Sequence, residues 1–90
     1  MDLSELVDRV PEGWTAVTYR GSRWGMSRTS RASGRSVAVY AEELQGNGVV
    51  SANVYRTEHG DQLRPCEMPA EIVLAFLQDW EPERPLGDSG

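Results

Sequence analysis

Residues 14–29 read WTAVTYRGSRWGMSRT, and this stretch decides the fold. Apolar and polar side chains alternate on both sides of a Gly-Ser pair, as in two antiparallel strands joined by a two-residue turn at Gly21-Ser22. Such a turn fixes which residues meet across the hairpin. On the apolar side it pairs Val17 with Met26 and Tyr19 with Trp24. The sequence therefore predicts a β-hairpin with these aromatic residues in the core and a polar opposite face.

Further strands follow the hairpin. Segments 36–44 and 49–56 alternate in the same way around a glycine-containing loop at 45–48, and a turn at 58–61 leads into a short strand that ends at Pro65. The polar residues 29–35 predict a loop between the two hairpins. If the 45–48 loop has four residues, Val39 meets Val54 on the inner side.

The spacing of apolar residues predicts a helix at each end of the chain. The first is short and starts with a capping box at Asp2 and Glu5. Pro69 suits the first position of the second helix. Its apolar stripe consists of Ile72, Val73, Phe76, Leu77 and Trp80. The element order predicts an α+β fold: an antiparallel sheet of four to five strands with a short N-terminal helix and a C-terminal helix packed on the sheet.

Length and composition indicate one modest domain. Ninety residues, of which 39% are hydrophobic, suffice for a single core and a shallow site. We expect this domain to cover residues 1–81 and residues 82–90 to form a disordered tail. The N-terminus is acidic, and the longest apolar run, residues 72–77, is far shorter than the ~20 residues of a membrane span. We therefore expect a cytoplasmic protein without membrane contact.

Charges are segregated along the chain. Residues 13–41 contain five arginines and no acid, although the formal net charge is −5. Arginines interleaved with aromatic residues favour single-stranded nucleic-acid binding, and we name Arg20, Arg23 and Arg28 as candidate binding residues. The predicted register instead assigns the aromatic residues to the core and the arginines to a solvated rim. With a net negative charge, such a face suits an acidic partner, including a second copy of the chain, better than a phosphate backbone.

The outer face of the second hairpin is another candidate surface. The predicted register places Tyr40, Asn53 and Tyr55 on it. Tyrosine and asparagine are common at binding surfaces because they supply contact area and hydrogen bonds at low entropic cost. Ordinary strand composition explains the same residues, so both interpretations stay open.

The chain has one histidine and one cysteine, which limits its chemistry. Zinc needs three or four suitable ligands, so we expect no metal. An extended strand would hold His59 and Cys66 roughly 20 Å apart, which argues against a Cys–His dyad. Cys66 itself is interpreted as a small buried residue where strand meets helix, with a nucleophilic role as the alternative.

Four segments resemble small uncharacterised proteins of high-GC actinobacteria: WTAVTYRG (14–21), YAEEL (40–44), VSAN (50–53) and RPCEMPAE (64–71). The resemblance covers most of residues 5–80, and some of those proteins carry the name peptide methionine sulfoxide reductase. It implies a thiol-dependent redox enzyme with Cys66 as its nucleophile. The chain lacks the Gly-Cys-Phe-Trp motif of A-type reductases and the paired zinc-ligand cysteines common in B-type ones, so its lone thiol would need an external reductant.

Taken together, the sequence favours a small non-enzymatic protein-interaction module without a cofactor. Its contact surface is expected to be either the arginine face of the first hairpin or the tyrosine face of the second. The expected partner is another protein or a second copy in a homodimer. A thiol-dependent redox enzyme working through Cys66 is the first alternative, and single-stranded nucleic-acid binding through the arginine-rich hairpin is the second.

Overall fold

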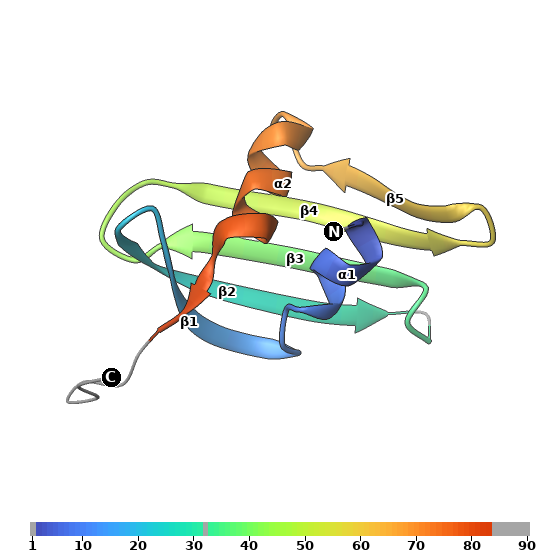
Figure 1. The fold of residues 1–90 in the computed structure, drawn as a ribbon, viewed down its shortest axis with the longest axis horizontal. Coiled ribbons are helices and arrows are strands. Elements are labelled where there is room, and N and C mark those ends of the chain that lie inside the picture. Colours follow the sequence, from blue (N-terminus) through green and yellow to red (C-terminus); the bar gives the residue numbers. More distant parts are fainter. Residues whose placement is uncertain (1, 32, 84–90) are drawn as a thin grey trace.

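The computed structural model describes residues 2–31 and 33–83 and has the predicted α+β fold (Figure 1). Its six strands form one antiparallel sheet in the order β5-β4-β3-β2-β1-β6. Both helices lie on the same face of this sheet, and neither covers the other face (Figure 1). In chain order the elements are α1 (Leu3–Asp8), β1 (Gly13–Tyr19), β2 (Ser22–Arg31), β3 (Ser36–Glu43), β4 (Val49–Thr57), β5 (Gly60–Pro65), α2 (Ala70–Asp79) and β6 (Glu81–Pro82).

The sixth strand, which the sequence does not predict, forms after α2. Glu81 and Pro82 pair with the end of β1, and the Oε1 atom of Glu83 lies 3.1 Å from Nη2 of Arg23. The start of the predicted 82–90 tail is therefore held at the edge of the sheet. Residues 84–90 of that tail lie outside the described residues.

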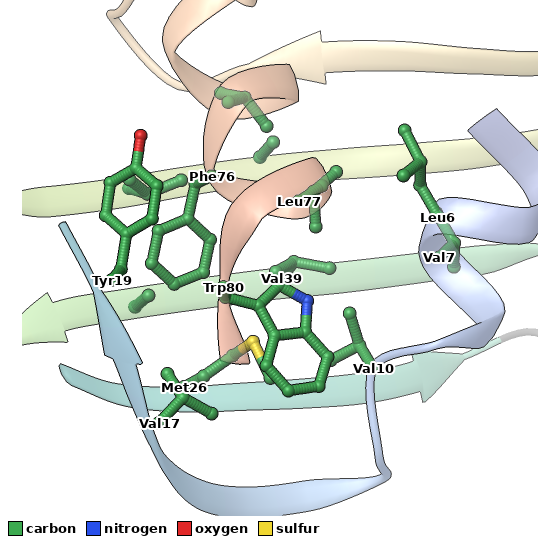
Figure 2. Close-up of a cluster of buried hydrophobic side chains, with 14 of the residues drawn as sticks. Leu6, Val7, Val10, Val17, Tyr19, Met26, Val39, Phe76, Leu77 and Trp80 are labelled. Carbon is green, nitrogen blue, oxygen red and sulfur yellow. The ribbon is translucent and has the colours of Figure 1, made fainter. Parts of the chain in front are cut away.

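The core fills the space between the helices and the sheet (Figure 2). The predicted inward residues of the first hairpin are buried there, and the ring of Phe76 lies 4.8 Å from that of Tyr19 and 5.2 Å from that of Trp24. Of the predicted α2 stripe, Ile72 is the exception. It is exposed, whereas the other four residues of the stripe are buried. Clustered aromatic and aliphatic burial of this kind is the main stabilising contribution in a domain of this size.

Both hairpin registers differ from the prediction by two residues. The first turn is centred on Arg20 and Gly21, with φ of 50° and 79°, so Val17 pairs with Trp24. In the second hairpin Val39 pairs with Ala52. A turn with positive φ at both central residues matches the twist of the flanking strands. A slip of two residues leaves every side chain on its predicted face.

The loop predicted over residues 29–35 is shorter than expected, because β2 continues through Thr29 to Arg31. The turn to β3 includes Ser33 and Gly34 with φ of 58° and 86°, and the N–H of Gly34 donates to the carbonyl of Arg31. A polar composition marked the segment as a loop, but Thr and Ser also suit the exposed side of a strand. The sheet face is therefore longer than the sequence indicates.

Side chains hold the N-terminal end of α1 and the C-terminal end of α2. Asp2 Oδ1 accepts a hydrogen bond from the backbone N–H of Glu5 at 2.9 Å, which confirms the predicted N-cap of α1. At the end of α2, the guanidinium of Arg9 donates to the carbonyls of Leu77 and Gln78 and lies over the ring of Trp80. Neither helix in the described part of the chain is long and apolar enough to cross a membrane.

Candidate interaction surface

The sheet face turned away from the helices carries the largest exposed side chains of the strands. We call this side of β1–β5 the open face. Trp14 is 63% exposed there, and Val49, Tyr40 and Tyr55 are 45%, 42% and 42% exposed. Several large exposed side chains on one sheet face make it a candidate interaction site. The open face therefore joins the outer sides of the two predicted hairpins, because β2 pairs with β3.

Trp14 lies flat on the open face because of a glycine in the neighbouring strand. A Cβ atom built at Gly25 would stand 2.8 Å from Nε1 of Trp14 and 3.0 Å from its Cζ2. Gly25 is itself buried although it faces away from the core. Close approach of another group is a standard reason for glycine in a strand interior. One side of the indole thus rests on the backbone of β2, and its other side is left to solvent.

A single cross-strand row runs the width of the open face. Trp14 pairs with Ser27, Ser27 with Tyr40 and Tyr40 with Ser51. Beyond the last of these, the N–H of Cys66 donates to the carbonyl of Ser51 at 2.9 Å. Because strands lie about 4.8 Å apart, the two aromatic residues of this row are about 10 Å apart with only a serine between them. Both rings are therefore accessible to the same partner.

Arg28, a predicted binding residue, does not belong to the open face. Its position in β2 has the same parity as the core residues Trp24 and Met26, so its side chain turns toward the helices. Nη1 donates to the carbonyls of Val7 and Val10 at 2.9 and 3.0 Å. These groups close the C-terminal end of α1, where unpaired carbonyls carry partial negative charge. The guanidinium of Arg28 therefore stabilises the end of α1, and its predicted role in binding a partner stays a prediction.

The other two predicted arginines lie at one end of the sheet. Arg23 is on the open face and forms an ion pair with Glu83. Arg20 sits in the β1–β2 turn, with its guanidinium 5.1 Å from the ring centre of Tyr19. Beside it is a hollow of about 390 Å³ that also contains Asp79 and Glu81 and that lies at the sheet edge. Neither residue is close to the aromatic row in the register of the sheet.

Two arginines that the sequence interpretation missed are better placed. Arg31 and Arg64 are exposed on the open face, and no described acid lies within ion-pair distance of either. The acid that shares this side of β1–β5 with them is Glu42. The alternation of side chains along each strand is the signal that could have found them, because it places both arginines on the same face of the sheet as Tyr40 and Tyr55. The open face therefore carries a local positive charge on an acidic protein.

Asn53 and Tyr55 occupy the places on the open face that the sequence predicts. Cys66 is exposed, contrary to the prediction that it is buried, because the chain leaves β5 at Pro65. Nδ2 of Asn53 lies 3.9 Å from its Sγ. His59 precedes β5 and Cys66 follows it, so the length of the strand separates them as expected. Across residues 2–31 and 33–83, no group of three or more potential metal ligands occurs.

No protein-family model, curated protein or solved structure matches this chain. The surface is consequently interpreted from its own residues. It is flat, aromatic, polar and mildly cationic, which are the features of a macromolecular interface and not of a cavity for a small molecule.

Proposed function

We propose that this protein is a small non-enzymatic interaction module that docks its open face onto another protein surface. The observation that carries the proposal is Trp14, which is 63% exposed yet held flat against Gly25 in the same row as Tyr40. A side chain that is already ordered loses little entropy on binding. Tryptophan, tyrosine and arginine are also the residues that dominate binding energy at protein interfaces.

The polar residues of the open face support the same proposal. Ser27, Ser51 and Asn53 lie between the aromatic side chains and offer hydrogen bonds to a partner. Interfaces of this kind have aromatic anchors surrounded by polar groups that exclude water. The helix-covered face, in contrast, is occupied by the protein's own core.

Single-stranded nucleic acid is the weaker proposal for this face. Aromatic stacking would be available at Trp14 and Tyr40. However, Arg28 is used by α1 and Arg23 by Glu83, so few cations remain on a chain with a formal net charge of −5. Phosphate binding depends on the number of such contacts.

The other alternative is a thiol-dependent redox enzyme. Its nucleophile, Cys66, is exposed at the rim of the open face, and the side-chain amide of Asn53 is the polar group described beside it.

The test is photo-crosslinking in the native host with a benzophenone amino acid in place of Tyr40. We expect a discrete crosslinked protein band at this position and none when the same group replaces Ile72, which is 49% exposed on α2. Addition of Trp14→Ala should weaken the band. Equal crosslinking from both positions, or none from Tyr40, would contradict the proposal, and crosslinking to nucleic acid would favour the weaker alternative.

A further inference from the structure

We infer that the partner of the open face is a second copy of this chain, packed face to face about a two-fold axis that runs along β3. This inference rests on the proposed function and names its partner. β3 is the middle of the strands β1–β5. A two-fold axis along it therefore covers all five strands, placing β2 over β4 of the other copy and β1 over β5. Closed two-fold dimers are the commonest assemblies of soluble proteins.

The area of the open face is just large enough for such a dimer. Five strands about 4.8 Å apart, with side-chain rows extending about 24 Å along them, give a face on the order of 600 Å². Two such faces would bury about 1,200 Å² in total, which is the lower end of the range for specific interfaces. Sheets that pack face to face lie about 10 Å apart, which leaves room for Trp14 and Tyr40 between them. Each face also carries a local positive charge, and like charges across an interface oppose association. The expected dimer is therefore weak and concentration-dependent.

The residues of β2 and β4 are complementary under this symmetry. Arg31, Ser36 and Tyr55 lie in one cross-strand row. The axis therefore brings the guanidinium of each copy over the phenol ring of the other, which gives two such contacts in the dimer. Cations over aromatic faces attract, more strongly when water is excluded. In the next row Thr29 and Asn53 lie on either side of Ala38 and would meet as hydrogen-bonding partners. An axis across the strands would instead bring Arg31 toward Arg23 of the other copy.

Tyr40 and Glu42 lie on β3 itself and would meet their own counterparts. The paired rings of Tyr40 would form the centre of the interface, where binding energy concentrates. The two Glu42 carboxylates would approach each other, and like charges across an interface oppose association. Each Glu42 Oε2 accepts a hydrogen bond from its own Tyr40 hydroxyl at 3.4 Å. Neutralising Glu42 should therefore strengthen the dimer, which is an unusual expectation for the loss of a surface charge.

Sedimentation equilibrium of the purified full chain tests the inference. We expect a monomer–dimer equilibrium that Tyr40→Ala and Arg31→Glu each weaken by about tenfold or more and that Glu42→Gln strengthens several-fold, about 1.4 kcal/mol corresponding to each factor of ten. Ile72→Ala removes a similarly exposed apolar side chain from the helical side and should leave the equilibrium unchanged. Arg20→Glu provides the same charge change outside the face. Circular dichroism of each variant checks that it is folded.

Three outcomes would overturn the inference. The first is a monomer at all concentrations up to about 1 mM, where even a weak specific dimer would be visible. The second is a dimer that tolerates both Tyr40→Ala and Arg31→Glu, and the third is a dimer that Glu42→Gln weakens. If the chain is monomeric while the Tyr40 crosslinker captures a different protein in the host, the second-copy inference fails and the proposed function stands. If the crosslinker captures nothing, both fail.

Discussion

The indole of Trp14 occupies the space that a side chain at position 25 would fill, with its Nε1 atom 2.8 Å from where the Cβ of residue 25 would lie. The two residues belong to neighbouring strands and are diagonal neighbours, since Gly25 pairs directly with Ala16. A contact of this length does not occur between a Cβ and a ring. Gly25 therefore sets the position of an exposed tryptophan.

Because of this contact, we predict that the effect of Gly25→Ala on the free energy of unfolding depends on the residue at position 14. In the wild-type chain the new methyl group should displace the indole and lower the free energy of unfolding by about 1 kcal/mol. In a Trp14→Ala background the same change should be neutral or stabilising, because alanine loses less backbone entropy than glycine on folding. Urea unfolding of the four proteins of this double-mutant cycle measures the coupling. Additive effects would show that the two residues are independent.

Gly48 has the corresponding relationship to a buried ring. A Cβ at this position would lie 2.6 Å from Cη2 of Trp24. Trp24 is buried and packs against both Tyr19 and Phe76, so it cannot move toward solvent as Trp14 can. We predict that Gly48→Ala lowers the unfolding free energy by about 1–3 kcal/mol, more than Gly25→Ala does. Thermal and urea denaturation of both variants would compare the two losses of stability. A smaller loss for Gly48→Ala than for Gly25→Ala would contradict the prediction.

Arg28 supplies a third prediction, which separates fold stability from binding. Arg28→Met keeps the length of the side chain but removes the donors to the carbonyls of Val7 and Val10. Partly buried carbonyls left without partners cost about 1–3 kcal/mol. We expect this loss in urea unfolding, together with unchanged Tyr40 crosslinking at a temperature where the variant is folded. Reduced crosslinking from a fully folded Arg28→Met protein would show that Arg28 contributes to binding.

The sequence predicts the architecture because side-chain parity survives errors of register. Both hairpins are displaced by two residues from the predicted pairing, yet Val17, Met26 and Val54 are buried as expected. The turn itself could not be placed, because Arg20 adopts a positive φ that local rules reserve for glycine and asparagine. The alternation along each strand therefore predicts which face a side chain occupies, but not which residue it pairs with.

The candidate site was predicted less completely for a different reason. Tyr40, Asn53 and Tyr55 follow from parity within one hairpin, but the continuity of their face with Trp14 depends on how the two hairpins join. The polar composition of residues 29–35 predicts a loop, so the pairing of β2 with β3 could not be predicted. Because Arg31 falls within that predicted loop, its place on the open face could not be predicted either. Cys66 was misplaced because its exposure depends on the path of the chain after Pro65, which no local pattern specifies.

The ion pair of Asp8 with Arg56 predicts a specific pH dependence. The hydrogen bond from Nη2 of Arg56, 2.7 Å from Oδ1, lowers the pKa of Asp8 below its ordinary value of 3.8. A carboxyl whose pKa is lower in the folded than in the unfolded protein stabilises the fold above the unfolded pKa, and that contribution is lost as pH falls through the folded pKa. Arg56 stays charged throughout.

We therefore expect Asp8→Asn to be less stable than the wild type at pH 7 and equally stable near the acid end of the titration, below both pKa values. Unfolding measured in urea between neutral and strongly acid pH gives this difference directly. Asp2→Asn is unsuitable as a control because Asp2 caps α1, whereas Glu58→Gln changes an exposed acid in the turn between β4 and β5. A constant difference between Asp8→Asn and the wild type over the whole range would show that Asp8 acts through its shape and not its charge.

Cys66 provides the prediction that separates the interaction module from a thiol enzyme. The side chain is exposed at the rim of the open face, so it should react with a thiol reagent in the native protein without prior unfolding. If the protein works by docking, Cys66→Ser should fold with a free energy of unfolding within about 0.5 kcal/mol of the wild type, as for other exposed substitutions. It should also retain the Tyr40 crosslink and the biological effect in the host. Loss of that effect in a folded, crosslinking Cys66→Ser protein would require covalent chemistry at the sulfur, because serine preserves the shape of the surface but is a far weaker nucleophile at neutral pH.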